Sequence, residues 1–225
     1  TKNKFLKLAA VSLSVVLLAT ACKKDFFEVE DPNGIDSQIW NDAGAVDLFL
    51  NRSYDLIIPN WPTVGGIHTT SDETNSVSTA FLYGQLVENS VTDIGGSNSI
   101  TNNRYFDIRR CNVAIDGLAT SLLPASVKDP LLGQFYFLRA FVYFRLVSLY
   151  GGVPLILKAQ DLTGEDLNVP RSKSSEVFAA IAKDLDSAAA KLPALWSGNN
   201  VGRITKATAM AFKGKALLYW ASPQF

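Results

Sequence analysis

The chain has 225 residues, of which 48% are hydrophobic and 19% are charged, and this composition excludes a disordered tail, a collagen-like fibre and a highly charged coiled coil. Its 21 basic and 21 acidic residues give no net charge, so a protein that binds nucleic acid through its phosphates is a poor fit. A single histidine, His68, argues against a His-rich metal site, and two cysteines, Cys22 and Cys111, exclude a disulfide framework and a Cys-rich zinc site.

Residues 1–21 are predicted to be a bacterial lipoprotein signal peptide. Three lysines precede an apolar run over residues 8–18, which is too short to span a bilayer. The small residues 19–21, directly before Cys22, resemble a lipobox, although Ala19 stands where a leucine is usual. We expect Cys22 to carry a palmitate-containing lipid anchor and residues 22–40 to form a charged tether. The alternative is an ordinary secretory signal with a chance cysteine.

Two segments of different character follow the tether. Residues 42–58 are predicted to form a helix, because their apolar side chains keep to one side, with Asn41 or Asp42 as its cap and Pro59 as its end. In residues 63–102, more than half of the positions are Gly, Ser, Thr or Asn, which favour turns. A loop of this length in a compact protein is usually functional or mobile.

A helix with one clear apolar stripe is predicted over residues 104–123, before Pro124. The spacing of its apolar residues, 3, 4, 3 and 4, places them on one face. These residues are Ile108, Cys111, Ile115, Leu118 and Leu122. Cys111 is therefore expected to be a buried structural thiol rather than a reactive one.

Residues 130–150 are predicted to form a long apolar helix, with Pro130 in its first turn and Gly151-Gly152 as its stop. Arg139 and Arg145 argue against a bilayer crossing, because an arginine near the middle of a bilayer costs about 2.5–3.5 kcal/mol. A helix that is apolar nearly all round is expected to be enclosed by other helices, and both arginines are expected to be ion-paired.

Two more helices are predicted near the end of the chain. The helix over 174–192 has Ser172 or Ser174 as its cap and charged residues, including Asp184, facing water. Its inward residues are Val177, Ile181, Leu185, Ala188 and Leu192. The helix over 205–222 begins at Thr205 as its cap. Its packed side is Ala209, Phe212, Ala216, Tyr219 and Trp220.

Helices of this length joined by short Pro/Gly breaks predict an all-α fold. Neighbouring pairs of such helices are typical of tetratricopeptide-like units, which stack into an α-solenoid or superhelix. A long loop-rich region separates the first two helices. Short extended pieces near Val153–Leu157 are the only strand-like sequence.

Three segments, in this order behind a lipoprotein signal, resemble the SusD/RagB family of nutrient-binding outer-membrane lipoproteins. The first is residues 133–147, GQFYFLRAFVYFRLV, followed by YGGVPL at 150–155. The second is PRS at 170–172 with the residues behind it, and the third is GRITKA at 202–207, running into LLYWASP at 217–223. Ser71-Asp72-Glu73 and the segment RRCN at 109–112 also fall where that family has similar segments.

The resemblance implies a helical lipoprotein that captures glycans, or peptides in some members, without catalysis and without a cofactor. It also implies a partner, a SusC-like TonB-dependent β-barrel transporter of the outer membrane, over which the lipoprotein sits on the cell exterior. Family members are commonly about twice as long, so residues 41–225 are expected to be the N-terminal part of the helical domain. Alone, this part is expected to expose apolar surface and aggregate.

The candidate ligand residues come from the 60–104 segment, because sugar rings stack on flat aromatic faces and their hydroxyls bond to amides and charges. They are Trp61, Asp72, Asn75, Tyr83, Asn98 and Arg104. Alternative roles remain open, since Trp61 could be a packing residue and Asp72-Glu73 could cap a helix. Two rival functions also remain: a surface glycoside hydrolase, which needs two carboxylates across a cleft, and a purely structural scaffold lipoprotein.

Overall fold

The computed structural model describes residues 37–58, 103–160 and 167–225, which belong to one compact unit, Ser37–Phe225. The described residues of the unit form α-helices and two short 3-10 helices, η2 and η6. In chain order the elements are η2 (Ser37–Asn41), α2 (Ala43–Ile57), α3 (Arg104–Thr120), α4 (Ala125–Tyr150), α5 (Ser174–Lys191), η6 (Gly198–Asn200) and α6 (Lys206–Trp220). These ranges contain no strand, and the extended piece near Val153–Leu157 joins no sheet. The predicted all-α class is confirmed.

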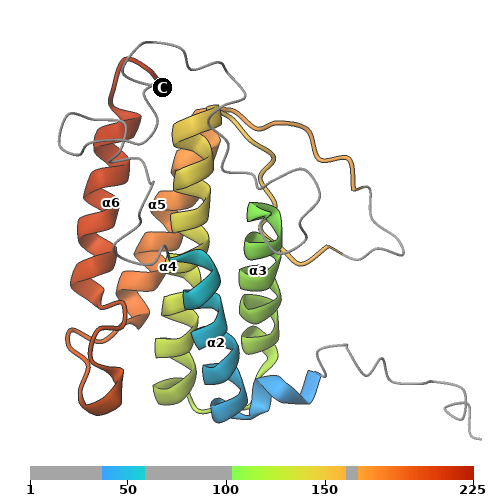
Figure 1. The fold of residues 1–225 in the computed structure, drawn as a ribbon, viewed down its shortest axis with the longest axis vertical. Coiled ribbons are helices and arrows are strands. Elements are labelled where there is room, and N and C mark those ends of the chain that lie inside the picture. The colour runs from blue at the N-terminus through green and yellow to red at the C-terminus, as the bar shows by residue number, and fades with distance from the viewer. Residues whose placement is uncertain (1–36, 59–102, 161–166) are drawn as a thin grey trace, which may run out of the picture. The chain divides into compact units, whose positions relative to one another are not determined.

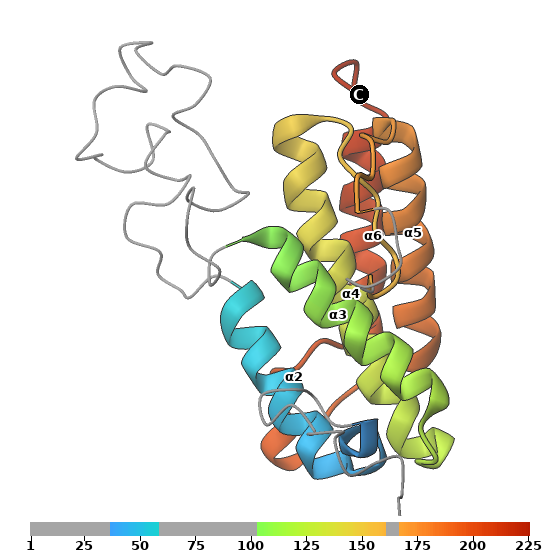
Figure 2. The same cartoon turned by 90° about the vertical axis from the view of Figure 1, so that its right-hand side faces the viewer.

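Helix α4 lies in the middle of the unit and packs against α2, α3, α5 and α6 (Figure 1). From α3 to α6, successive helices run in opposite directions, which both views show (Figures 1 and 2). Each helix is therefore antiparallel to the next, as tetratricopeptide-like pairs require. No helix in the described ranges combines the length and hydropathy that a bilayer span needs.

The unit reaches back to η2, whose Trp40 is buried against α3. A Cβ atom added to Gly117 would lie 2.4 Å from the Trp40 ring, so only glycine allows this close approach. The Trp40 ring also meets Phe49 of α2 edge to face, with ring centroids 5.6 Å apart. Trp40 thus joins the first helical turn of the unit to both α2 and α3.

The predicted N-caps of α2 and α6 are confirmed, whereas α6 ends at Trp220, two residues before the predicted end. The Asp42 carboxylate accepts hydrogen bonds from the Gly44 and Ala45 N–H groups, at 2.8 and 3.2 Å. The Thr205 hydroxyl accepts from the Thr208 N–H at 3.2 Å. Pro59, the expected end of α2, lies outside the described residues.

The packed side of α6 is partly as predicted. Ala209 and Ala216 are buried, whereas Tyr219 is 41% exposed, although its ring meets the Phe144 ring in a T-shaped contact. The outer side of α6 exposes apolar residues, among them Met210 and Leu218. The expected exposure of apolar surface is therefore present, and the aggregation expected from it stays a prediction.

The predicted end of the helix over 104–123 is wrong. Helix α3 ends at Thr120, because Ser121 takes an extended conformation and its hydroxyl donates to the Trp40 carbonyl at 2.5 Å. Leu122 consequently leaves the apolar stripe and is 87% exposed. The other four residues of the predicted stripe are buried, and Cys111 is a buried free thiol as expected.

The start of α4 also differs from the prediction. The helix begins at Ala125, so Pro130 is its sixth residue and not part of its first turn. Its end is as predicted, because Gly151 adopts a φ of +67°, which favours glycine. Leu192 is buried and the inward face of α5 is confirmed, but neither serine caps this helix: Lys173 precedes it, and its N–H donates to the Glu176 carboxylate at 2.9 Å.

Asp184 does not face water, as the sequence led us to expect, but forms a buried ion pair with Arg139 of α4. Two hydrogen bonds, both 2.7 Å long, join the guanidinium to the carboxylate. The same guanidinium donates to the Asn112 side chain of α3 at 2.8 Å and to the Leu157 carbonyl at 2.9 Å. Arg139 is therefore ion-paired as predicted, and it joins three helices and one extended segment.

Replacing Arg139 with methionine should destabilise the protein by about 3–5 kcal/mol, because the Asp184 carboxylate would stay buried without its cation. Urea unfolding followed by circular dichroism measures this loss. Arg139→Met combined with Asp184→Leu should recover part of the stability, since no buried charge remains.

Arg52→Met is the matched control for this test. Arg52 pairs with Asp55 on α2, but both side chains are more than half exposed, so its loss should cost less than about 1 kcal/mol. Equal unfolding curves for Arg139→Met and Arg52→Met would contradict the importance assigned to the buried pair.

Tyr54 joins α2 to the segment before α6. Its hydroxyl donates to the Gln134 side chain at 2.7 Å and accepts from the Ile204 N–H at 3.2 Å. Burial raises the pKa of Tyr54 to about 12, although the Ile204 hydrogen bond and Arg203 oppose the rise. The phenol therefore stays protonated in the folded protein at pH values where it ionises in the unfolded chain.

The stability that Tyr54 contributes is complete below pH 10 and should be lost as the pH rises to about 12, because the unfolded state releases the proton first. Tyr54→Phe lacks this ionisation. The difference in unfolding free energy between wild type and Tyr54→Phe should therefore shrink by about 1 kcal/mol between pH 9 and pH 11. If urea titrations gave the same difference in unfolding free energy at both pH values, burial would not raise the pKa of Tyr54.

Candidate functional site

Five of the six predicted ligand residues lie outside the described residues, in the segment that joins α2 to α3. These five are Trp61, Asp72, Asn75, Tyr83 and Asn98. The described structure fixes the two helix ends that this segment connects, Ile57 of α2 and Arg104 of α3. The ligand roles of the five residues stay predictions.

Arg104, the sixth predicted residue, is the first residue of α3 and forms an ion pair with Asp107 at 2.9 Å. Both side chains are largely buried. Burial raises the pKa of the Asp107 carboxyl, and the positive charges of Arg104, Arg110 and Arg145 oppose this rise. Arg104 thus has a structural partner in the described part of the chain, and a ligand role for it remains a prediction.

A polar stripe on α3 holds the extended segment 154–160 by its main chain. The stripe consists of Tyr105, Arg109, Asn112 and Asp116, spaced 4, 3 and 4 residues apart, so the four side chains share one face. Tyr105 donates to the Pro154 carbonyl at 3.1 Å, and Arg109 donates to the Gln160 carbonyl at 2.7 Å.

The middle of the segment is held from both α3 and α4. The Asn112 amide donates to the carbonyls of Ile156 and Lys158, both at 3.0 Å, and Asp116 accepts from the Ala159 N–H at 3.0 Å. From α4, the Tyr143 hydroxyl donates to the Ile156 carbonyl and accepts from its N–H, at 2.9 and 2.7 Å. Every one of these hydrogen bonds goes to main-chain atoms, so the bonds do not depend on the side chains of the segment, of which Leu155 also packs against the core.

The sequence did not lead us to predict that α3 holds an extended segment, although it contains a pattern that indicates this role. The residues that hold the segment repeat with helical spacing beside the apolar stripe of α3, so they were visible as a second, polar stripe. The segment follows the Gly151-Gly152 stop and begins with Pro154, which favours an extended conformation of the residue before it. The sequence YGGVPL therefore ends α4, reverses the direction of the chain and starts the extended segment 154–160.

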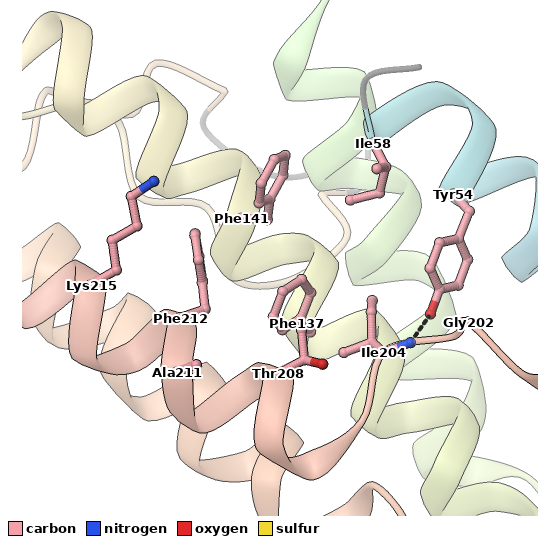
Figure 3. Close-up of a pocket in the computed structure, with 10 residues that line it drawn as sticks. All are labelled: Tyr54, Ile58, Phe137, Phe141, Gly202, Ile204, Thr208, Ala211, Phe212 and Lys215. Carbon is pink, nitrogen blue, oxygen red and sulfur yellow. Dashed lines mark hydrogen bonds between the residues drawn. The ribbon is translucent and has the colours of Figure 1, made fainter. Parts of the chain in front are cut away.

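An open apolar groove of about 530 Å³ lies between α2, α4 and the start of α6 (Figure 3). Phe137 and Phe141 of α4 and Phe212 of α6 line one side, with ring centroids 5.4 and 5.6 Å from Phe212. Tyr54 and Ile58, at the end of α2, line the other side. The groove ends where the segment with the predicted ligand residues begins.

The chemistry of this groove favours an apolar occupant. Its lining contains three phenylalanines, and Lys215 lies at its end, with its ammonium group 5.8 Å from the Phe144 ring. Apolar surface of this kind gains free energy by losing contact with water, at roughly 25 cal/mol per Å². It offers few partners for the hydroxyls of a sugar.

Covalent and metal chemistry find little support in the described residues. No group of three His, Cys, Asp or Glu side chains gathers there in a way that could hold a metal ion. Cys111 is fully buried, and burial raises the pKa of its thiol, so the reactive thiolate form is disfavoured. His68 lies outside the described ranges.

Comparison with known proteins gives a family. The family described as "Starch-binding associating with outer membrane", SusD-like, matches residues 25–218. A SusD-like protein of Formosa agariphila is 27% identical over 224 residues, covering 96% of this chain and 43% of its own length.

Solved structures agree with this result. A SusD-like protein of Bacteroides fragilis is 30% identical, with a TM-score of 0.67, over 82% of this chain and 36% of its own. A laminarin-binding SusD-like protein shares the fold, with 23% identity and a TM-score of 0.57, over 82% of this chain and 40% of its own.

The chain thus spans less than half the length of these relatives. The family match, in contrast, extends over most of the chain, from the residues behind Cys22 to the end of α6. The chain belongs to the SusD-like family.

Proposed function

We propose that this protein is a surface lipoprotein that binds nutrient glycans and passes them to a TonB-dependent transporter of the outer membrane. The family match over residues 25–218 carries the proposal, because that family is described as starch-binding and associated with the outer membrane. The lipobox-like residues before Cys22 lie just ahead of this match and supply an anchor. Residues 1–21 would be the signal peptide, the residues from Cys22 up to the compact unit the tether, and the unit Ser37–Phe225 part of the ligand-binding domain.

The names of several relatives support glycans as the ligand. One neighbour in structure is a laminarin-binding protein, and two others are surface glycan-binding proteins of Bacteroides fluxus and Bacteroides uniformis. Trp61, Tyr83 and the polar residues between α2 and α3 supply the flat rings and hydrogen-bonding groups that sugars need. A peptide ligand is the alternative within the same family.

A surface glycoside hydrolase is the weaker candidate. Such an enzyme needs two carboxyl groups facing each other across a cleft, about 5–10 Å apart. In the described ranges, Asp107 and Asp184 are buried and each is bonded to an arginine, so neither is presented to a sugar. A structural scaffold would bind the transporter without any glycan.

Trp61→Ala combined with Tyr83→Ala should weaken glycan binding at least tenfold, because two stacking faces are lost. Isothermal titration calorimetry with starch and laminarin oligosaccharides measures the change, and a peptide mixture tests the alternative ligand. Tyr219→Ala, which removes an exposed aromatic ring of α6, is the control and should bind as wild type does.

Two results would oppose the glycan-binding proposal. Unchanged affinity in the double variant would remove Trp61 and Tyr83 from the binding site. New reducing ends in the incubated glycan would instead favour a hydrolase, since a binding protein releases none.

Cells grown with radiolabelled palmitate should label the wild-type protein, and Cys22→Ser should abolish the label. Cys111→Ala is the matched control and should keep the label, because that thiol is buried in the core. Protease treatment of intact cells should digest the labelled protein, and a TonB-dependent barrel should co-purify with it in detergent. A label that survives Cys22→Ser, or a wild-type protein without label, would contradict the proposed anchor.

A further inference from the structure

A second cavity, of about 280 Å³, lies at the opposite end of α2 from the segment with the predicted ligand residues. Residues of the connection between α5 and α6 and of the first turns of α2 and α4 form the cavity. Figure 1 shows these parts of the chain at the lower end of the unit. The cavity is lined by Ala43, Asp47, Ser126, Val127, Pro130, Leu131, Gln134, Trp196, Asn200 and Arg203. None of these residues belongs to the predicted ligand set.

Trp196 gives this cavity an aromatic wall that is held in place. Its indole N–H donates to the Ile204 carbonyl at 2.8 Å, and its side chain is half-buried. The hydrogen bond fixes the orientation of the ring, so little side-chain freedom is lost when a ligand packs against it. A fixed indole ring is a suitable surface for the C–H groups of a sugar ring.

The polar side of the cavity contains an ion pair and carries no net charge. The Arg203 guanidinium bonds to both oxygens of Asp47, at 2.5 and 2.9 Å, and also donates to the Asn51 side chain at 2.9 Å. Because the two charges neutralise each other, the cavity offers donors and acceptors without a net charge. This favours a neutral ligand over a charged peptide terminus or an acidic sugar.

Pro130 of α4 leaves one helical carbonyl group without its usual hydrogen-bond donor. It lies inside α4 and has no N–H, so the carbonyl of Ser126, four residues earlier, has no donor at its usual helical position. Ser126 and Pro130 both line the cavity. The lining of the cavity thus includes Ser126, with a hydroxyl and a carbonyl that lacks its helical donor, together with Trp196 and the exposed Asn200.

We propose that this cavity is a binding site for one neutral sugar ring of a glycan. The ring stacks on Trp196, and its hydroxyls bond to Asn200, to the Ser126 carbonyl and to the Asp47–Arg203 pair. The volume is just below the roughly 300–1,000 Å³ of pockets for drug-sized ligands, which suits a single ring rather than a chain. This assignment rests on the proposed function, and it adds a second site to it.

The larger apolar groove does not compete for this role. Phenylalanines dominate its lining, whereas the cavity at Trp196 combines one indole ring with an amide, an ion pair and a main-chain acceptor. Sugars need both kinds of surface at once, because their rings have apolar faces and hydroxyl edges.

The test uses the purified protein labelled with ¹⁵N in its tryptophan indoles and titrated with maltohexaose and, separately, laminarihexaose. The indole N–H signal of Trp196, assigned from Trp196→Phe, should shift on saturation. Asn200→Ala should weaken the binding that moves this signal about three- to tenfold, because one amide contact is lost. Trp196→Ala should abolish that binding, while Trp61→Ala should still show the shift of the Trp196 signal on saturation.

Asn200→Ala keeps the test valid if Trp196→Ala unfolds, since Asn200 is exposed and the hydrogen bonds of η6 come from its main chain. A hexasaccharide that binds by calorimetry without moving the Trp196 signal would overturn the second site and leave the proposed function intact. Binding of neither hexasaccharide would overturn both. A Trp196 shift with a neutral peptide alone would overturn the assignment to sugar.

Discussion

The fold depends on one buried charge. Arg139 lies in the middle of α4, surrounded by apolar residues, and the desolvation of its guanidinium is compensated only because Asp184 and two other acceptors meet it. These partners come from α5, from α3 and from the extended segment, so the position of each element is tied to the same group. A core of apolar side chains that match only in volume and pattern would specify the positions of the helices less uniquely.

The path of the extended segment 154–160 is fixed by contacts of the same kind. Its main chain is held by Tyr105, Arg109, Asn112 and Asp116 of α3 and by Tyr143 and Arg139 of α4. Main-chain bonds fix the path of a segment without restricting its side chains. The exposed side chains of the segment, Leu157 and Lys158, therefore take no part in the hydrogen bonds that fix its path.

Hydrophobic periodicity was sufficient to predict the helices, but polar partners were harder to predict. Asp184 lies on the same face as Val177, Ile181 and Ala188, so the spacing already placed it inward, and its charge misled the prediction. The pairing with Arg139 could not be read from the sequence, because it joins residues 45 positions apart. Leu122 was misplaced for a similar reason, since its helix ends through a contact with Trp40 far away in the chain.

In our proposals, the two ligand regions are separated along the chain by helix α2, and such an arrangement would favour polymers. Helix α2 has 15 residues and is therefore about 22 Å long. The cavity at Trp196 lies at its first turn, and the segment with Trp61 and Tyr83 follows its last turn. A single sugar can occupy only one such site and binds weakly. A glycan chain that reaches both gains from the high effective concentration of its second ring, so even two shallow sites favour the polymer over its free sugars.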